Sequence, residues 1–287
     1  MQKLERSESK LAAQFKAVED SDHSGVTSSS SLASGFNPNN LIDQRQFAGI
    51  LQLYGEAALA RLQASHVVVA GIGGVGSWAA EALARSAVGR ITLIDMDHVS
   101  VSNINRQVHA LHSTLGSSKI EVMAARLRDI QPNLDLQLID DFLTLDNLHQ
   151  RLDFAFDGLI DAIDQASVKA ALIAHIHHRK LPMVVCGAAG GRVDPLALKA
   201  QDLAFTTQDA LLSNIRARLR KQHGFPRDLK KAFGVTAIYS LEPWRGHRAS
   251  RDAGSALACS GFGSSMMLTA SMGLASVVRL IEKLMTL

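Results

Sequence analysis

The chain has 287 residues, of which 47% are apolar, 20% charged and 5% aromatic, so it can bury a substantial core in one large domain or two small ones. Its two cysteines, Cys186 and Cys259, exclude a disulfide framework and indicate a reducing compartment. The 30 Lys and Arg against 27 Asp and Glu leave a net charge of +3, which is too small to indicate nucleic-acid binding by itself. Any basic surface must therefore be local.

Residues 1–40 form a charged and then serine-rich head that is predicted to be disordered. Its serine run, residues 21–35, offers few large apolar side chains to offset the entropy of ordering. The charged start is not followed by an apolar run of signal-peptide length, so a cytoplasmic location is expected. The folded domain is predicted over residues 41–287, with a nucleotide-binding part over about 41–195 and a basic C-terminal part over about 196–287.

From residue 44 onward, short β-branched runs alternate with segments of helical periodicity. Strands are predicted at His66–Ala70, Arg90–Ile94, Leu134–Ile139, Leu159–Ile163 and Pro182–Cys186, and helices at Ser77–Ala87, Lys119–Gln131 and Val168–His178. This alternation predicts βαβ units, and so a Rossmann-like, doubly wound α/β fold with a mainly parallel sheet and helices on both faces.

The last third of the chain differs in its charge pattern. Between Lys199 and Arg251 there are eleven Lys or Arg and four acidic residues, a local charge of +7. The basic stretch Arg216 to Lys231 is a candidate nucleic-acid surface, and a solvated helix with a charged loop is the structural alternative. Residues 253–278 carry no charge over a length that could cross a bilayer. Their many Ser and Gly residues favour a helix buried in the domain, with membrane association as the alternative.

A glycine loop directly follows the first predicted strand. It reads Gly71-Ile-Gly73-Gly74-Val-Gly76 and leads into a helix, which is the G-x-G-x-x-G spacing in a strand-turn-helix setting. Such glycines allow the tight turn, let backbone N–H groups approach phosphate and permit close helix packing. Asp95 ends the next strand, 19 residues after Gly76, where a carboxylate meets ribose hydroxyls. These features predict a nucleotide site, and by themselves they would suit an NAD-dependent dehydrogenase.

The polar residues that follow this second strand favour ATP over a dinucleotide. Asp97, Asn103, Arg106 and Gln107 lie in one segment, and Lys119 begins the next predicted helix. Arg binds phosphate oxygens bidentately and Lys acts as a compact charge. This set therefore suits a triphosphate whose α-phosphorus is attacked by a carboxylate.

Two carboxylates, Asp161 and Asp164, end a later strand at the carboxyl edge of the sheet, where open α/β folds place their ligands. Carboxylate oxygens suit Mg²⁺ bound to phosphates. We assign the metal to Asp164 with Asp161 as second choice, and capping of the following helix is the alternative for Asp161. His175 and His178 could share a helix face, but no third ligand lies near them in sequence, so a solvated helix end is expected there.

Together these motifs resemble the E1-like adenylating superfamily, which contains the ubiquitin-activating enzymes and the bacterial activators of sulfur-carrier proteins. The resemblance extends from Gln44 to the C-terminus, and the motifs that carry it are Gly71–Gly76, Asp95-Met-Asp97, Ser102–Gln107, Lys119 and Asp161–Asp164. Within the superfamily, it is strongest to the dehydratases of tRNA threonylcarbamoyladenosine. The segments that support this are Phe47–Gly55, Gly74–Ala84, Gly187–Pro195 and Ser260–Gly263.

The resemblance implies ATP-dependent activation of the carboxylate of N6-threonylcarbamoyladenosine at position 37 of tRNA, followed by a cyclisation that expels AMP. It implies ATP and Mg²⁺ as cofactors, tRNA as a partner, a homodimer, and a sulfur-transfer helper protein as a further candidate. An arginine near the start of the fold commonly reaches the partner subunit's ATP in this superfamily. This chain has Gln46 and Gln52 at the matching positions, so the neighbouring Arg45 is the candidate.

The cysteines distinguish this chain from other members of the superfamily. Sulfur-carrier activators usually carry paired Cys-x-x-Cys zinc motifs, which this sequence lacks. Cys186 ends an apolar strand and is predicted to be a buried structural thiol, and Cys259 is not predicted to be catalytic. The alternatives are an adenylyltransferase that activates the C-terminus of a small sulfur-carrier or ubiquitin-like protein, an NAD-dependent dehydrogenase, and a nucleotide-binding scaffold without turnover.

Overall fold

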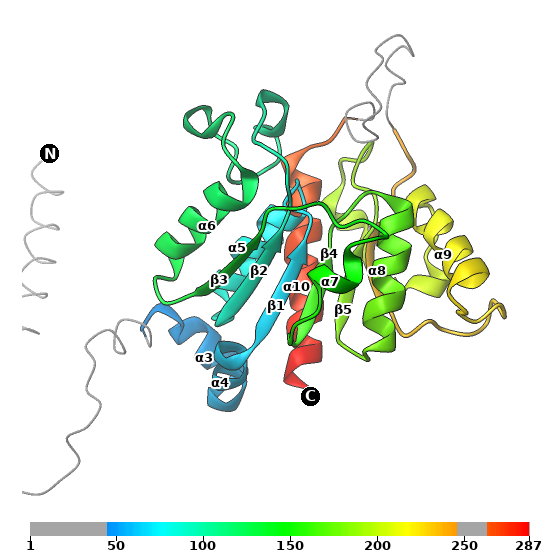
Figure 1. Cartoon of the computed structure of the whole chain (residues 1–287), viewed down its shortest axis with the longest axis horizontal. Helices are drawn as coiled ribbons and strands as arrows, with labels where there is room; N and C mark the ends of the chain where they lie inside the picture. The colour runs from blue at the N-terminus through cyan, green and yellow to red at the C-terminus, as the bar shows by residue number, and fades with distance from the viewer. Residues whose placement is uncertain (1–44, 246–262, 287) are drawn as a thin grey trace, which may run out of the picture. The chain divides into compact units, whose positions relative to one another are not determined.

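Seven strands form one sheet in the computed structural model, which describes residues 45–245 and 263–286. The strands are β1 His66–Ala70, β2 Arg90–Ile94, β3 Asp135–Ile139, β4 Gly158–Asp161, β5 Met183–Cys186, β6 Leu198–Asp202 and β7 Thr236–Ser240. Their order is β3-β2-β1-β4-β5-β7-β6, and neighbouring strands are parallel except for the antiparallel pair of β6 and β7. The predicted mainly parallel, Rossmann-like sheet is confirmed (Figure 1).

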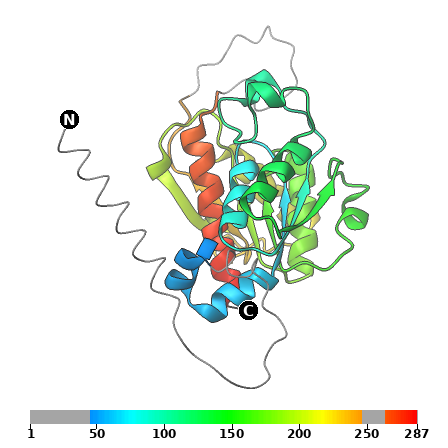
Figure 2. The ribbon, with the colours of Figure 1, turned by 90° about the vertical axis from the view of Figure 1, so that its left-hand side faces the viewer.

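Helices cover both faces of this sheet, as predicted (Figures 1 and 2). The described helices are α3 Ala48–Tyr54, α4 Glu56–Ala64, α5 Gly76–Arg85, α6 Lys119–Ile130, α7 Leu148–Arg151, α8 Ala166–His178, α9 Ala210–Gln222 and α10 Met266–Met285. Helices α5, α6 and α10 share one hydrophobic cluster with Val67 and Val69, whereas α7, α8 and α9 share the other with Val68 and Ala70. Because successive strand side chains point to opposite faces, β1 contributes to both clusters.

The boundaries of most predicted elements agree with the structure to within two or three residues. Strands β1 and β2 match residue for residue. Strand β4 ends at Asp161 rather than Ile163, because the Asp161 carboxylate accepts the Ile163 N–H at 3.1 Å and the chain turns there. Elements α3, α4, α7, β6 and β7 have no predicted counterpart, and α9 lies in the basic stretch for which a solvated helix is the structural alternative.

The uncharged run of residues 253–278 lies partly in α10, which continues beyond it into charged residues up to Met285. Residues 253–262, including Cys259, lie outside the described residues, as does the serine-rich head. Helix α10 buries Leu268, Met272, Leu280 and six further residues, as expected for a helix packed in the domain. Over the described residues, no helix combines the length and the apolar content that crossing a membrane requires.

The strand order reverses between β1 and β4, because the chain leaves β3 on one side of β1 and enters β4 on the other. Open α/β sheets bind ligands outside the carboxyl ends of the strands at such a point. The glycine loop follows β1, and of the two predicted metal ligands Asp161 ends β4 and Asp164 follows it. The fold therefore places these two sequence motifs next to each other.

Candidate functional site

The glycine loop is tightly packed against the segment that follows β4. Gly71 has a φ of +88°, and a Cβ on it would lie 3.0 Å from the Ala162 carbonyl oxygen. A Cβ on Gly76 would lie only 1.8 Å from the Gly71 carbonyl oxygen. The Ser77 N–H donates to the Gly73 carbonyl at 3.1 Å, so α5 begins directly out of the loop. The loop thus points a helix N-terminus at the carboxyl edge of the sheet, which is suited to an anion.

Asp95 connects the end of β2 to this loop. One carboxylate oxygen accepts the Ile72 N–H at 2.6 Å and the other accepts the Asp97 N–H at 2.9 Å. The side chain is buried, with 8% of the residue exposed. Its position beside the glycine loop is the one expected for a carboxylate that meets a ribose.

Lys119 lies at the same edge and is held by Asp97. Its Nζ is 2.6 Å from Asp97 Oδ2, and its side chain is 7% exposed. Because Lys119 is the first residue of α6, the helix dipole opposes its charge. A cation in this place needs an anionic neighbour, which is Asp97 in this structure and would be a phosphate in a nucleotide complex.

Arg106 lies over the glycine loop. A Cβ on Gly74 would lie 3.1 Å from its Cγ, and its carbonyl accepts the Trp78 indole N–H at 2.9 Å. Its Nη1 donates to the Ser102 carbonyl at 2.6 Å and to Asn105 Oδ1 at 2.9 Å. The guanidinium is thus oriented by its own loop beside the expected phosphate position.

Asn103 and Gln107 belong to the loop that carries Arg106. Asn103 Oδ1 accepts the Ser100 N–H at 3.0 Å and closes a capping turn, and the residue is 8% exposed. The Gln107 N–H donates to the Asn103 carbonyl at 3.0 Å. Gln107 Oε1 is buried and has no hydrogen-bond partner among the described residues. Asn103 therefore shapes the loop, and Gln107 retains a polar atom for a ligand or water.

The two aspartates at the end of β4 and just after it differ in position. Asp161 is fully buried, and its Oδ1 lies 2.9 Å from Lys169 Nζ, which also donates to the Asp161 and Ile163 carbonyls at 2.9 Å. Its side chain therefore faces the interior, not the sheet edge, and does not fit the second-choice metal ligand. It does not cap α8 either, since Gln165 holds that position. Asp164 is exposed and follows Ala162 and Ile163, whose backbone atoms lie within 3.3 Å of the Cβ position of Gly71.

Arg45 is exposed and does not join this site within one chain. The neighbouring Gln46 donates its side-chain amide to the Ile130 carbonyl at the last turn of α6. Lys119 occupies the first turn of that 12-residue helix, which is about 16 Å away along its axis. A role for Arg45 would thus require a second chain.

Helix α10 and the residues just before it pack against the glycine loop and the Arg106 loop, a contact that the sequence did not predict. A Cβ on Gly273 would lie 2.5 Å from the Val75 carbonyl oxygen, and Thr269 Cγ2 lies 3.2 Å from the corresponding position of Gly74. Asn105 Nδ2 donates to the Ser264 carbonyl at 2.7 Å. The small residues of the uncharged run allow this approach, and they were the only sequence signal for it.

His109 is another buried residue near Lys119 that the sequence did not single out. It is 1% exposed, and neither ring nitrogen has a hydrogen-bond partner among the described residues. Burial, together with the positive charges of Lys119 and Arg126, lowers the pKa of His109 to about 4. The imidazole is therefore neutral at pH 7.

Cys186 at the end of β5 is buried, as predicted. Burial raises the pKa of this thiol to about 11, so it carries no thiolate at neutral pH. Within the described parts of the chain, no three His, Cys, Asp or Glu side chains come together as a metal site.

Similar proteins carry the same architecture. The tRNA threonylcarbamoyladenosine dehydratase of Escherichia coli K12 is 43% identical over 252 residues, which cover 84% of this chain and 94% of that protein. The enzyme of the same name from Haemophilus influenzae is 41% identical over 245 residues, with the same coverage. The crystal structure of the E. coli dehydratase in complex with ATP has a TM-score of 0.78 at 43% identity and covers 85% of this chain and 95% of that chain. The ThiF family matches residues 44–282. The chain belongs to the ThiF family.

Proposed function

We propose that this protein is an ATP-dependent dehydratase that cyclises N6-threonylcarbamoyladenosine in tRNA. The observation that carries this proposal is the similarity to the E. coli dehydratase, which extends over 94% of that protein at 43% identity. The geometry supports it, because Asp95, Lys119 and Arg106 surround one glycine loop at the point where the strand order reverses.

In this proposal, each residue has a task that follows from its position. The N-terminus of α5 and the loop N–H groups receive the phosphates, and Asp95 accepts the ribose hydroxyls. Lys119 exchanges Asp97 for a phosphate oxygen, and Arg106 stabilises the charge that develops when the substrate carboxylate attacks the α-phosphorus and pyrophosphate leaves. Ring closure within the nucleoside then expels AMP, and the high effective molarity of a tethered group makes a separate nucleophile unnecessary.

Asp164 is the residue proposed to hold Mg²⁺. It is exposed and lies one residue after the segment that packs against Gly71, and one carboxylate together with substrate phosphates is a usual way of binding this ion. When bound, Mg²⁺ would neutralise phosphate charge during the transfer.

The direct test incubates the protein with ATP, Mg²⁺ and tRNA that carries the threonylcarbamoyl modification, and follows the nucleoside by mass spectrometry. Loss of one water is expected. Arg106→Ala and Asp164→Ala should abolish the reaction at unchanged melting temperature, whereas Arg128→Ala, at an exposed position of α6, should not. Full activity of either of the first two variants would refute the role assigned to that residue.

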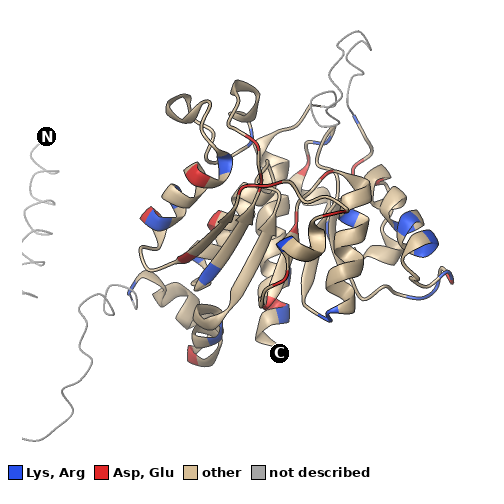
Figure 3. Ribbon diagram, in the orientation of Figure 1, with Lys and Arg blue, Asp and Glu red and all other residues tan. Residues whose placement is uncertain are grey.

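The basic stretch Arg216 to Lys231 is proposed to face the tRNA (Figure 3). Two of its arginines serve the fold: Arg216 donates to Thr206 Oγ1 at 2.5 Å, and Arg220 donates to the Pro226 carbonyl at 3.1 Å. Arg218 is half-buried, and the exposed members of the stretch are Lys221, Arg227, Lys230 and Lys231. Substituting these by Gln should weaken tRNA binding and reduce its salt dependence, with ATP binding unchanged.

A homodimer is proposed from the exposed face of α10. Met267, Leu274 and Val278 are 57%, 47% and 45% exposed and lie on one helical stripe. An apolar stripe of this kind is suited to a second copy, whose Arg45 could then reach the nucleotide. Sedimentation of the wild type as a dimer and of Leu274→Glu as a monomer would support this arrangement, and a monomeric wild type would refute it.

The adenylyltransferase alternative remains distinguishable by experiment. An enzyme that activates a small carrier protein would exchange ATP and pyrophosphate only when that protein is present and would not respond to tRNA. Absence of water loss from the modified tRNA, combined with carrier-dependent exchange, would replace the dehydratase proposal by this one.

A further inference from the structure

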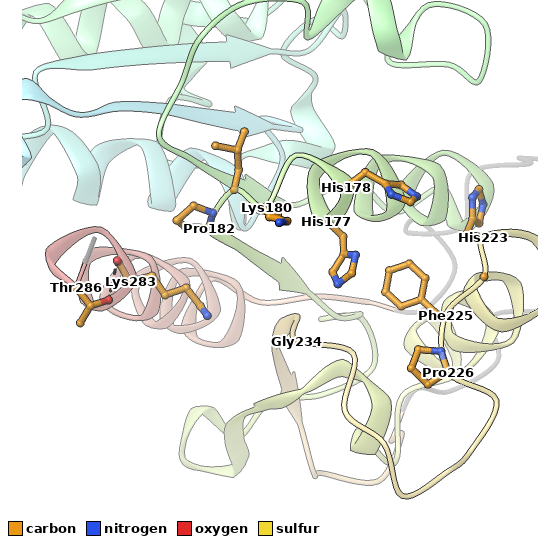
Figure 4. Close-up of a pocket in the computed structure, with 12 residues that line it drawn as sticks. His177, His178, Lys180, Pro182, His223, Phe225, Pro226, Gly234, Lys283 and Thr286 are labelled. Carbon is orange, nitrogen blue, oxygen red and sulfur yellow. Dashed lines mark hydrogen bonds between the residues drawn. The ribbon is translucent and has the colours of Figure 1, made fainter.

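A cavity of about 680 Å³ lies at the amino edge of the sheet, on the opposite side from the glycine loop (Figure 4). Helices α8, α9 and α10 end at this cavity, and β5 and β7 begin beside it. Five of its lining side chains are basic, and none of the described residues that line it is acidic. The basic residues are His177, His178, Lys180, His223 and Lys283. Figure 4 shows the His177 ring and the Lys283 side chain directed toward the same space.

Lys180 adopts a backbone conformation that usually belongs to glycine. Its φ is +55°, and it follows the last residues of α8. The Lys180 N–H donates to the His177 carbonyl at 3.0 Å, and the Leu181 N–H donates to the Ile176 carbonyl at 3.3 Å. These two bonds form a Schellman motif, in which a left-handed residue without a Cβ is preferred. Lysine here costs backbone strain.

Two other residues that follow helices with a positive φ, Gly224 and Ala87, can be compared with Lys180. Helix α9 ends at the same cavity with Gly224 at a φ of +72°, the residue type that the conformation favours. Helix α5 is followed by Ala87 at a φ of +66°, but that side chain is fully buried and packs with Phe47 and Leu59. Lys180 is exposed, so packing does not account for its side chain. A strained residue of this kind points to a function.

The electrostatic surroundings indicate that this function is anion binding. Helix C-termini carry about half a negative charge each, and a cation there is partly a complement to the helix. Lys180 and Lys283 line the cavity together with three histidines and, among the described lining residues, no acid, so the charge at the cavity exceeds that need. The adjoining residues 210–235 hold seven further Lys or Arg and one acid. The exposed Arg227, Lys230 and Lys231 continue this charge away from the cavity.

We propose that this cavity is a second phosphate-binding site, which receives a backbone phosphate of tRNA. The tRNA as the source of the phosphate rests on the proposed function and on the continuity of the cavity with the basic stretch. The volume lies in the range of small-ligand sites, roughly 300 to 1,000 Å³, and so accommodates part of a nucleotide chain. A five-residue strand spans about 16 Å, so an RNA strand extends from one sheet edge to the other over a few nucleotides.

The first test locates phosphate in the cavity without any catalysis. Histidine ring resonances of the ¹³C-labelled protein, assigned with single substitutions, are followed during titration with inorganic phosphate at constant ionic strength. The signals of His177, His178 and His223 should shift together in the wild type. They should shift much less in the double variant Lys180→Gly with Lys283→Gln. Unmoved signals in the wild type would overturn the proposal.

The second test measures tRNA binding by fluorescence anisotropy. The double variant should bind tRNA roughly tenfold more weakly, with a smaller salt dependence, because two cations near the phosphates are lost. The control Arg128→Gln removes one charge from α6 and should bind tRNA like the wild type. Lys180→Gly alone should melt no lower than the wild type, since glycine relieves the strain. Melting of the double variant near the wild-type temperature excludes misfolding as the cause of its weaker binding. Equal tRNA affinity of wild type and double variant would overturn the tRNA assignment and leave free phosphate as the ligand.

These tests separate the cavity from the dehydratase proposal. Phosphate titration and tRNA binding do not require the reaction to occur. A wild type that binds tRNA through the cavity but catalyses no loss of water would refute the dehydratase proposal and leave the cavity proposal intact. A double variant that is active and binds tRNA with wild-type affinity would refute the cavity proposal and leave the dehydratase proposal intact.

Discussion

Adding one methyl group to the glycine loop should weaken nucleotide binding. In Gly76→Ala, the new Cβ would lie 1.8 Å from the Gly71 carbonyl oxygen, at least 1.2 Å inside the 3.0 Å limit that Cβ contacts respect. Gly71 cannot easily retreat, because its N–H donates to the Ile94 carbonyl at 2.9 Å and its own Cβ position is 3.0 Å from Ala162. Overpacking of this kind costs about 1–3 kcal/mol, and a displacement of about 1 Å at a binding loop can cost a hundredfold in activity.

The assay combines thermal melting with calorimetric ATP titration. For a domain of this size, 1 kcal/mol corresponds to about 2–4 °C, so Gly76→Ala should melt roughly 2–12 °C lower and should bind ATP at least tenfold more weakly. Gly49→Ala in α3 is the matched control, because nothing lies within 4 Å of its Cβ position and alanine favours a helix. Wild-type melting and ATP affinity in Gly76→Ala would refute the argument.

Two further predictions concern buried charge and pH. Lys169→Met should lower the free energy of unfolding, measured in urea, by about 3–5 kcal/mol, because Asp161 is left buried and unpaired. The control Arg279→Met, which breaks an exposed ion pair, should lower it by at most about 1 kcal/mol. Equal losses in the two variants would contradict the argument from the buried pair. Because burial lowers the pKa of His109 from 6.5 to about 4, the unfolded chain takes up this proton first as the pH falls, so about 3 kcal/mol of stability should be lost between pH 6.5 and 4. His109→Gln should flatten that pH dependence, and an unchanged slope would show that other groups cause it.

The sheet centre was predictable because its strands are short β-branched runs that are buried on both faces. The edge was not. Strand β6 reads Leu-Lys-Ala-Gln-Asp, with Lys199 and Ala200 exposed, and pairs only with β7. Its strand conformation depends on that partner, and strand propensity is weak where tertiary pairing decides.

The candidate site was predictable in its members but not in all their orientations. Glycine spacing and the positions of Asp95, Arg106 and Lys119 follow from the chain order of strand, loop and helix. Which of two aspartates three residues apart faces inward depends on Lys169, which the structure buries under β4. A lysine within an otherwise apolar helix segment was the available signal for such a buried partner.

The contact between α10 and the glycine loop has a consequence for biosynthesis. The Cβ position of Gly74 lies 3.2 Å from Thr269 Cγ2, so the loop reaches its final packing only after a segment 195 residues further along the chain has been synthesised. At about 5–20 residues per second, this delay is roughly 10 to 40 s. During that time, the apolar face of α5 that α10 covers is open to the solvent or to a chaperone. The nucleotide loop is therefore among the earliest segments of the domain to be made and among the last to reach its final packing.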